Sequence, residues 1–170
     1  MFKGSYSVTI TPTSNDGKIK VKSLEKYFNW QIKKRIGGLI ILGSTGEFLS
    51  ISDNNRLKMI KESSSIIDKR VPLFVGTAAE NTYEAIRYSV EAQAQNADGV
   101  MIIPPFYSTP TPEELINHFK MISKEIDIPI MVYNNPATSN IDITPDIFAE
   151  LSKIKNVEYC KESTMDVTRV

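Results

Sequence analysis

The sequence predicts an α/β protein built on a parallel sheet. Six short apolar runs rich in β-branched residues alternate with five longer stretches in which apolar residues recur at helical spacing. Several short runs are almost continuously hydrophobic, as is typical of strands covered on both faces. This order indicates parallel strands joined by right-handed helical crossovers, in either a doubly wound open sheet or a (β/α)8 barrel.

The expected strands are Tyr6–Ile10, Gly38–Leu42, Pro72–Gly76, Gly99–Ile103, Pro129–Tyr133 and Val157–Lys161. No linker, low-complexity segment or charge block interrupts this pattern. We therefore expect residues 1–170 to form a single domain.

Helix-start signals precede the longer stretches. The segment 111–114 (Thr-Pro-Glu-Glu) supplies a capping hydroxyl, a proline at the first helical position and a glutamate three residues after the cap. The segment 144–146 (Thr-Pro-Asp) repeats this opening. Ser52 and, more weakly, Asn81 are further N-cap candidates. Apolar residues at helical spacing from Leu24 to Ile32 mark the first helix.

Composition excludes several classes of protein. The chain has 20 Lys+Arg and 20 Asp+Glu, so its formal charge of zero gives no general attraction to nucleic acid or to an anionic membrane. A single cysteine and the lack of a His/Cys cluster predict neither an internal disulfide nor a metal site. With no signal-peptide pattern and no apolar run near the roughly 18 residues of a membrane span, we expect a cytoplasmic protein.

Neither phosphate-loop fingerprint is present, which weakens the case for a nucleotide-binding open sheet. The turn at 43–46 (Gly-Ser-Thr-Gly) is followed by Glu47 rather than lysine, and no G-x-G-x-x-G occurs. We therefore expect no cofactor.

In either architecture the site forms at the carboxyl ends of the strands. Hydroxyls, two tyrosines and one lysine gather there: Thr11, Ser44, Thr45, Tyr107, Tyr133 and Lys161. A lysine amine shielded from water loses its proton more readily and then attacks carbonyl carbon, and the resulting Schiff base is an electron sink for carbon–carbon bond chemistry. The alternative is that Lys161 only pairs with Glu162 at a strand end.

Other candidates also have structural alternatives. Tyr133 relays a proton if a hydroxyl such as Ser44 orients it, but tyrosines are common in strands. The 43–46 turn presents N–H groups to a carboxylate, or is simply a tight turn. His118 is expected to lie at the surface or to serve packing, and Cys160 is expected in the core, on the strand face opposite Lys161.

Four motifs together carry a family resemblance. They are Gly-Ser-Thr-Gly-Glu at 43–47, Pro-Pro-Phe-Tyr at 104–107, Tyr-Asn-Asn-Pro at 133–136 and Lys-Glu-Ser at 161–163. In this order they resemble the pyruvate-dependent class I aldolases of the dihydrodipicolinate synthase/N-acetylneuraminate lyase family. The resemblance implies a (β/α)8 barrel, of which this chain carries strands 1–6 and helices 1–5. Because eight units need roughly 250 residues, we expect a barrel domain truncated at its C-terminus.

The resemblance also implies roles for the site residues. Lys161 matches the Schiff-base lysine and Tyr133 the proton-shuttling tyrosine. Ser44 links Tyr133 to the relay, and Tyr107 reaches the site of a neighbouring subunit. For substrate binding, the residues expected to hold the pyruvate are Thr11, Thr45 and Gly46. The implied partners are pyruvate, a small aldehyde and further copies of the chain, as a dimer or tetramer.

One departure concerns the aldehyde. Dihydrodipicolinate synthases carry an arginine at the position of Thr138, where it binds the carboxylate of aspartate semialdehyde. Threonine is not a bidentate cation, so a Schiff-base lyase or synthase acting on another aldehyde, such as an N-acetylneuraminate or 2-keto-3-deoxy-sugar acid aldolase, is the alternative. From another class, a truncated, non-catalytic family member that binds ligand or assembles with other subunits remains open.

Overall fold

The computed structural model describes residues 2–169, which divide into two compact units. Of the described residues, the N-terminal unit comprises 2–76 with Glu91–Asp98, and the C-terminal unit comprises Thr77–Val90 with 99–169. Each unit contains three parallel strands.

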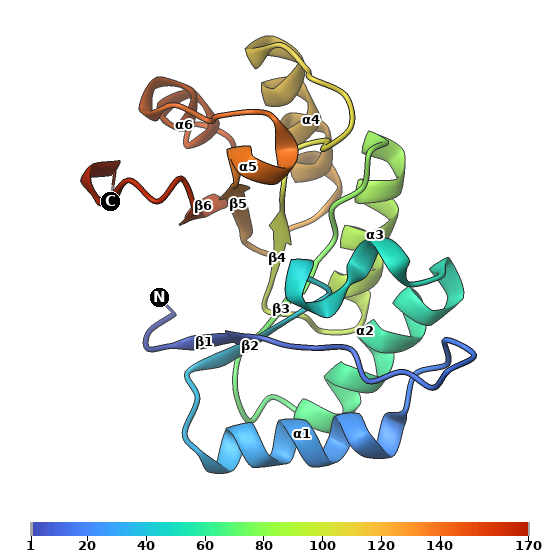
Figure 1. Cartoon of the computed structure of the whole chain (residues 1–170). Helices are drawn as coiled ribbons and strands as arrows, with labels where there is room; N and C mark the ends of the chain where they lie inside the picture. The colour runs from blue at the N-terminus through green and yellow to red at the C-terminus, as the bar shows by residue number, and fades with distance from the viewer. Residues whose placement is uncertain (1, 170) are drawn as a thin grey trace. The chain divides into compact units, whose positions relative to one another are not determined.

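The N-terminal unit is built around a central strand that pairs with one strand on each side. Its elements are β1 (Tyr6–Val8), α1 (Val21–Lys33), β2 (Gly38–Ile41), the 3-10 turns η1 (Ser44–Gly46) and η2 (Phe48–Ser50), α2 (Asp53–Ile67) and β3 (Leu73–Gly76). Strand β2 pairs in parallel with β1 on one side and β3 on the other, and Figure 1 shows β1 running alongside β2. All four residues of β2 and of β3 are buried, as their continuous apolar sequence predicts.

The C-terminal unit repeats this arrangement around its own central strand. Its elements are β4 (Gly99–Ile102), α4 (Pro112–Glu125), β5 (Ile130–Asn134), α5 (Pro136–Ser139), α6 (Pro145–Leu151), β6 (Val157–Glu162) and the 3-10 turn η3 (Val167–Arg169). Strand β5 lies between β4 and β6 and is parallel to both. Helix α3 (Thr82–Ala94) begins in this unit and ends in the N-terminal one.

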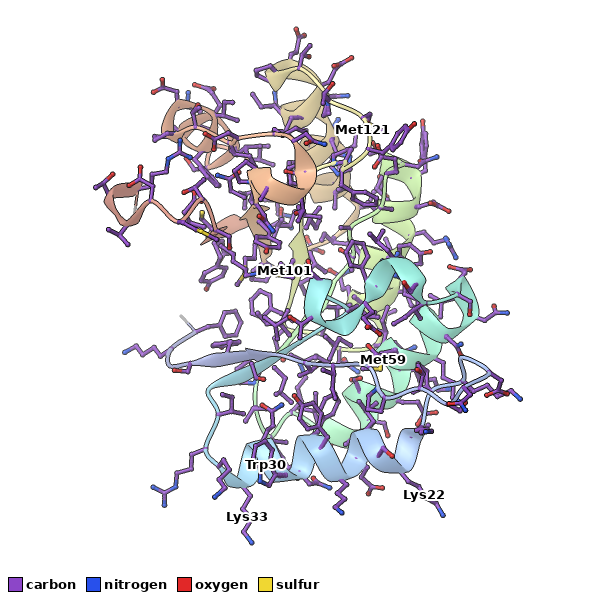
Figure 2. The ribbon with its side chains drawn as sticks, in the orientation of Figure 1. Lys22, Trp30, Lys33, Met59, Met101 and Met121 are labelled. Carbon is purple, nitrogen blue, oxygen red and sulfur yellow. The ribbon has the colours of Figure 1, made fainter. Side chains whose placement is uncertain are left out.

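The helices follow the expected amphipathic pattern. In α1, Leu24 and Phe28 are fully buried, whereas Trp30 is exposed. Lys22 and Lys33 of the same helix extend away from the body of the N-terminal unit (Figure 2). Burial of one apolar stripe is therefore what fixes the orientation of α1.

The capping predictions are confirmed to different degrees. Thr111 and Glu114 form the complete capping box of α4, and the Asn81 side chain accepts the Tyr83 N–H at 2.8 Å at the start of α3. Ser52 and Thr144 occupy the N-caps of α2 and α6 without a side-chain bond to the helix.

The structure differs from the sequence prediction mainly at element ends. Strand β1 ends at Val8 rather than Ile10, and Ile10 is 51% exposed although Thr9 beside it is fully buried. The four-residue α5 was not predicted, since one helical turn is too short to show periodicity. Among the described residues, no helix combines the length and apolar character that crossing a membrane requires.

Candidate active site

Lys161 and Tyr133 face each other at the carboxyl ends of neighbouring strands. The parallel register of β5 and β6 pairs Tyr133 with Lys161. The Lys161 Nζ lies 3.4 Å from the centroid of the Tyr133 ring. Tyr133 is 6% exposed and Lys161 half-buried, so an amine and a phenol share a site that is partly shielded from water.

The polar neighbours of Tyr133 favour its ionised form. Burial raises the pKa of the phenol, but the interactions with Lys161 and the hydrogen bonds with Ser163 and Asn135 outweigh burial, so the pKa lies below its usual value. The Asn135 Nδ2 donates to the phenol oxygen at 3.0 Å. A phenol in these surroundings passes a proton more readily than a free tyrosine.

The alternation along β6 agrees with the predicted faces, but the expected burial of Cys160 was wrong. Val157, Tyr159 and Lys161 are half-buried, whereas Glu158 and Cys160 are exposed. Cys160 lies at a cavity of about 360 Å³ lined in part by Phe148 and Arg169. Phe148 belongs to α6, so this helix borders the cavity while the thiol remains exposed.

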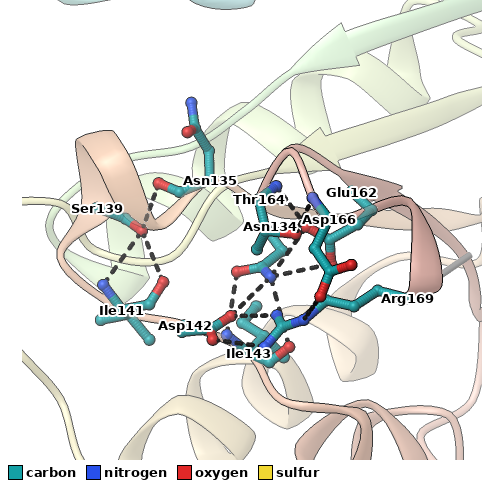
Figure 3. A network of polar contacts seen from close by, with 10 residues as sticks. All are labelled: Asn134, Asn135, Ser139, Ile141, Asp142, Ile143, Glu162, Thr164, Asp166 and Arg169. Atoms are coloured by element: carbon teal, nitrogen blue, oxygen red, sulfur yellow. Dashed lines mark hydrogen bonds and ion pairs between the residues drawn. The ribbon is translucent and has the colours of Figure 1, made fainter.

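A buried amide ties the end of β5 to its surroundings (Figure 3). The fully buried Asn134 donates its Nδ2 hydrogens to Glu162 Oε2 at 3.0 Å and to Asp142 Oδ1 at 3.1 Å, and its Oδ1 accepts the Ile143 N–H at 3.0 Å. Arg169 forms a two-pronged ion pair with Asp142, at 2.6 and 2.8 Å. Because Asn134 follows Tyr133 and Glu162 follows Lys161, this network holds the register that places the amine opposite the phenol.

The turn after β2 carries the predicted hydroxyl pair. Ser44 and Thr45 are exposed, and Gly46 is buried. The Thr11 Oγ1 donates to the Gly46 carbonyl at 2.8 Å, so two of the expected substrate-binding residues contact each other. A Cβ at Gly46 would lie 3.0 Å from the Thr9 carbonyl oxygen, which explains the glycine.

The segment that carries Tyr107 is held by a carboxylate that the sequence did not reveal. Glu80 accepts the backbone N–H groups of Phe106, Tyr107 and Ser108 and the Ser108 hydroxyl, at 2.6 to 3.0 Å. Burial raises the pKa of Glu80, but these hydrogen bonds outweigh it and lower the pKa. The Tyr107 side chain itself is 90% exposed. This contact has no recognisable sequence motif, because a single glutamate in a loop has many possible hydrogen-bond partners.

Of the two expectations for His118, surface or packing, the structure shows packing. The ring is 4% exposed, its Nδ1 lies 2.9 Å from the Thr82 Oγ1, and it meets Phe119 edge-on. Burial lowers the pKa of His118 to about 4, against a smaller opposing effect of Glu80. The imidazole is therefore neutral at neutral pH.

The structure thus brings together two pairs of the predicted residues: Lys161 with Tyr133 in the C-terminal unit, and Thr11 with Gly46 in the N-terminal unit. The link between Ser44 and Tyr133, and the roles of Thr45 and Tyr107, stay predictions. Among residues 2–169, no group of three or more metal-binding side chains occurs.

Polar side chains at the carboxyl ends of parallel strands are characteristic of α/β barrel proteins, and comparisons specify the family. The chain matches the model of the dihydrodipicolinate synthetase family over residues 1–170. It is 40% identical to 4-hydroxy-tetrahydrodipicolinate synthase of Persephonella marina, over 100% of this chain and 58% of that relative. It is 35% identical to 4-hydroxy-tetrahydrodipicolinate synthase 1 of Clostridium acetobutylicum, with the same coverage.

Solved structures agree with the sequence matches. A chloride-inhibited dihydrodipicolinate synthase from Acinetobacter baumannii complexed with pyruvate has a TM-score of 0.96 and 34% identity, over 99% of this chain and 58% of that chain. A prophage protein of the dihydrodipicolinic acid synthase family from E. coli K12, also in complex with pyruvate, has a TM-score of 0.96 and 29% identity, over 99% and 57%.

The chain belongs to the dihydrodipicolinate synthetase family, and the predicted (β/α)8-barrel fold class is confirmed. It spans 58% of the length of the two relatives named above.

Proposed function

We propose that this protein is a Schiff-base lyase or synthase that condenses pyruvate with an aldehyde or releases it. The observation that carries the proposal is the Lys161 amine, 3.4 Å from the centroid of the Tyr133 ring at the ends of adjacent parallel strands. An amine and an acid–base group so close together are what imine chemistry requires.

The proposed reaction begins at the keto carbon of pyruvate. Once Lys161 has given up a proton, its amine adds to this carbon, and the carbinolamine loses water to leave an imine, with Tyr133 moving the protons. Loss of a proton from the methyl carbon gives an enamine, which forms a carbon–carbon bond with the aldehyde. Hydrolysis of the imine restores Lys161 and releases the product. Cleavage runs through the same steps in reverse.

Thr11, Thr45 and Gly46 are the proposed holders of the pyruvate carboxylate, and Ser44 is the proposed link of Tyr133 to the proton relay. The exposure of Ser44 and Thr45 at the end of β2 supports these roles, because both residues are accessible to a ligand. The 90% exposed Tyr107 supports a role at another subunit and hence a homo-oligomer. A cytoplasmic location is part of the same proposal.

The identity of the aldehyde partner is a separate question, and Thr138 bears on it. Thr138 is exposed, and its hydroxyl donates to the Asn135 carbonyl oxygen of its own short helix at 3.3 Å. A hydroxyl used in this way does not replace a cation that binds a carboxylate. This favours an uncharged partner, such as the open form of a sugar, over aspartate semialdehyde.

Exchange of the pyruvate methyl protons tests the imine and enamine steps without an aldehyde. The chain is incubated with pyruvate in deuterium oxide, and the methyl signal is followed by NMR. We expect loss of the signal faster than in buffer, and no loss beyond buffer for Lys161→Arg, which keeps the charge but not the nucleophile. Pyruvate binding without exchange would instead support the non-catalytic alternative.

A further inference from the structure

The asparagine at the third position of the Tyr-Asn-Asn-Pro motif has an unusual use of its side chain. Asn135 is the N-cap residue of α5, where an asparagine side chain ordinarily accepts a hydrogen bond from the first turn. Its side chain makes no such bond. Instead its Nδ2 donates to the Tyr133 phenol oxygen at 3.0 Å.

The helix start is secured without the side chain. The Asn135 carbonyl oxygen accepts the backbone N–H groups of Thr138 and Ser139, each at 3.0 Å, and the Ser139 hydroxyl at 3.0 Å. Pro136 at the first helical position has no N–H to satisfy. Because the first turn of α5 is closed without the Asn135 side chain, the amide is left for Tyr133.

We infer that Asn135 is a positioning residue, which fixes the Tyr133 phenol oxygen and stabilises its ionised form during proton transfer. The inference rests on the proposed function and adds to it a residue that acts through Tyr133 rather than on the substrate. An N–H donor aimed at the phenol oxygen interacts more strongly with a phenolate than with a neutral phenol. Together with Lys161 it restricts where the phenol oxygen lies.

A test of this role must separate the effect of Asn135 on Tyr133 from the effects of the other charged and polar groups nearby. Lys161 faces the ring from β6, and Ser163 adds a hydroxyl beyond the same strand. Glu162 is directed instead to the Asn134 amide, with its Oε2 3.0 Å from Nδ2. A change in Asn135 therefore alters the phenol while the Lys161 strand keeps its own contacts.

The test uses two substitutions that leave the backbone bonds of α5 in place. Asn135→Val removes the donor, and Asn135→Asp replaces it with a negative charge. Asn29→Asp, at an exposed position of α1, is the matched control for the added charge. Circular dichroism of each variant verifies the fold.

The first readout is the ionisation of Tyr133, followed by tyrosinate absorbance during a pH titration. Tyr133→Phe identifies its contribution among the seven tyrosines. We expect the Tyr133 pKa to rise in Asn135→Val and to rise further in Asn135→Asp, while Asn29→Asp overlays the parent. Titrations of both Asn135 variants that overlay the parent would overturn the inference, whatever the activity.

The second readout is the rate of pyruvate methyl-proton exchange as a function of pH. We expect Asn135→Val to slow exchange about fivefold at neutral pH, the rate equivalent of one hydrogen bond, and its pH profile to move in the direction of the Tyr133 pKa. Absence of exchange in the parent together with a shifted titration would reject the proposed function and leave the contact with Tyr133 supported. Normal exchange and an unmoved profile in both variants would reject the positioning role alone.

Discussion

The Lys161 Nζ lies over the face of the Tyr133 ring, 3.4 Å from its centroid. The strand register alone sets these residues opposite each other, and the ring face attracts a cationic amine. The phenol oxygen at the ring edge remains free to bond Asn135. The Tyr133 ring thus contacts the Lys161 amine, while the Tyr133 hydroxyl is the group proposed to transfer protons.

The Asn134 amide should be required for the stability of the C-terminal unit. Asn134→Leu keeps the volume but leaves the Ile143 N–H and the Glu162 and Asp142 carboxylates without their shared partner. We expect the free energy of unfolding to fall by about 2–4 kcal/mol, measured by urea denaturation.

The control for this substitution is Asn117→Leu on α4. Asn117 is exposed, and its amide donates to the Met121 sulfur at 3.7 Å. We expect its effect to stay within about 0.5 kcal/mol. Equal effects of the two substitutions would contradict the structural role of Asn134.

Protonation of His118 should destabilise the fold in mild acid. Its folded-state pKa of about 4 lies below the ordinary value of 6.5. The stability that this residue contributes is therefore fully present above pH 6.5. It declines as the pH falls from 6.5 to 4 and levels off below 4, and the total loss in the free energy of unfolding is about 3 kcal/mol. The nearby carboxylates Glu80 and Glu114 have pKa values lowered by hydrogen bonds, mainly from Ser108 to Glu80 and from Thr111 to Glu114.

NMR reads this prediction directly, because His118 is the single histidine of the chain. Its ring-proton resonances should titrate with a midpoint near 4. In His118→Gln, the free energy of unfolding should vary less between pH 6.5 and 4 than in the parent. A midpoint near 6.5 would show that the ring is accessible and that burial does not lower its pKa.

Thr138→Arg should change which aldehydes react. The arginine would offer a planar pair of donors to a carboxylate on the aldehyde. We expect condensation of pyruvate with a carboxylate-bearing aldehyde to gain about tenfold relative to an uncharged one, since a charge-assisted hydrogen bond is worth about 1.5–3 kcal/mol. Thr138→Gln is the uncharged control, and steady-state competition between the two aldehydes is the measurement.

A parent protein that already prefers the carboxylate-bearing aldehyde would contradict this interpretation of Thr138. The preference would then arise from another cation, and the arginine substitution would add little.

Strand and cap positions were the features most accessible from sequence. A fully buried strand such as β4 is a continuous apolar run, and the capping box of Thr111 and Glu114 is a local signal read within four residues. Helix α5 has no such signal. It is a single turn, and its first hydrogen bonds go from backbone N–H groups to the Asn135 carbonyl oxygen, which composition does not predict.

The site was accessible only in part, for a similar reason. Lys161 and Tyr133 stand at the ends of predictable strands, so their meeting follows from parallel pairing. The contacts of Asn135 and Glu80 depend on side-chain direction within loops. The exposure of Cys160 depends on which other segments cover β6, and the alternation of residues within the strand does not reveal these segments.

Reductive trapping tests the central claim most directly. The chain is mixed with pyruvate, reduced with borohydride and digested, and the modified peptide is mapped by mass spectrometry. We predict a reduced pyruvyl group on Lys161 and its loss in Lys161→Arg. An unmodified Lys161, or equal labelling of exposed lysines such as Lys22 and Lys33, would contradict the proposed Schiff base.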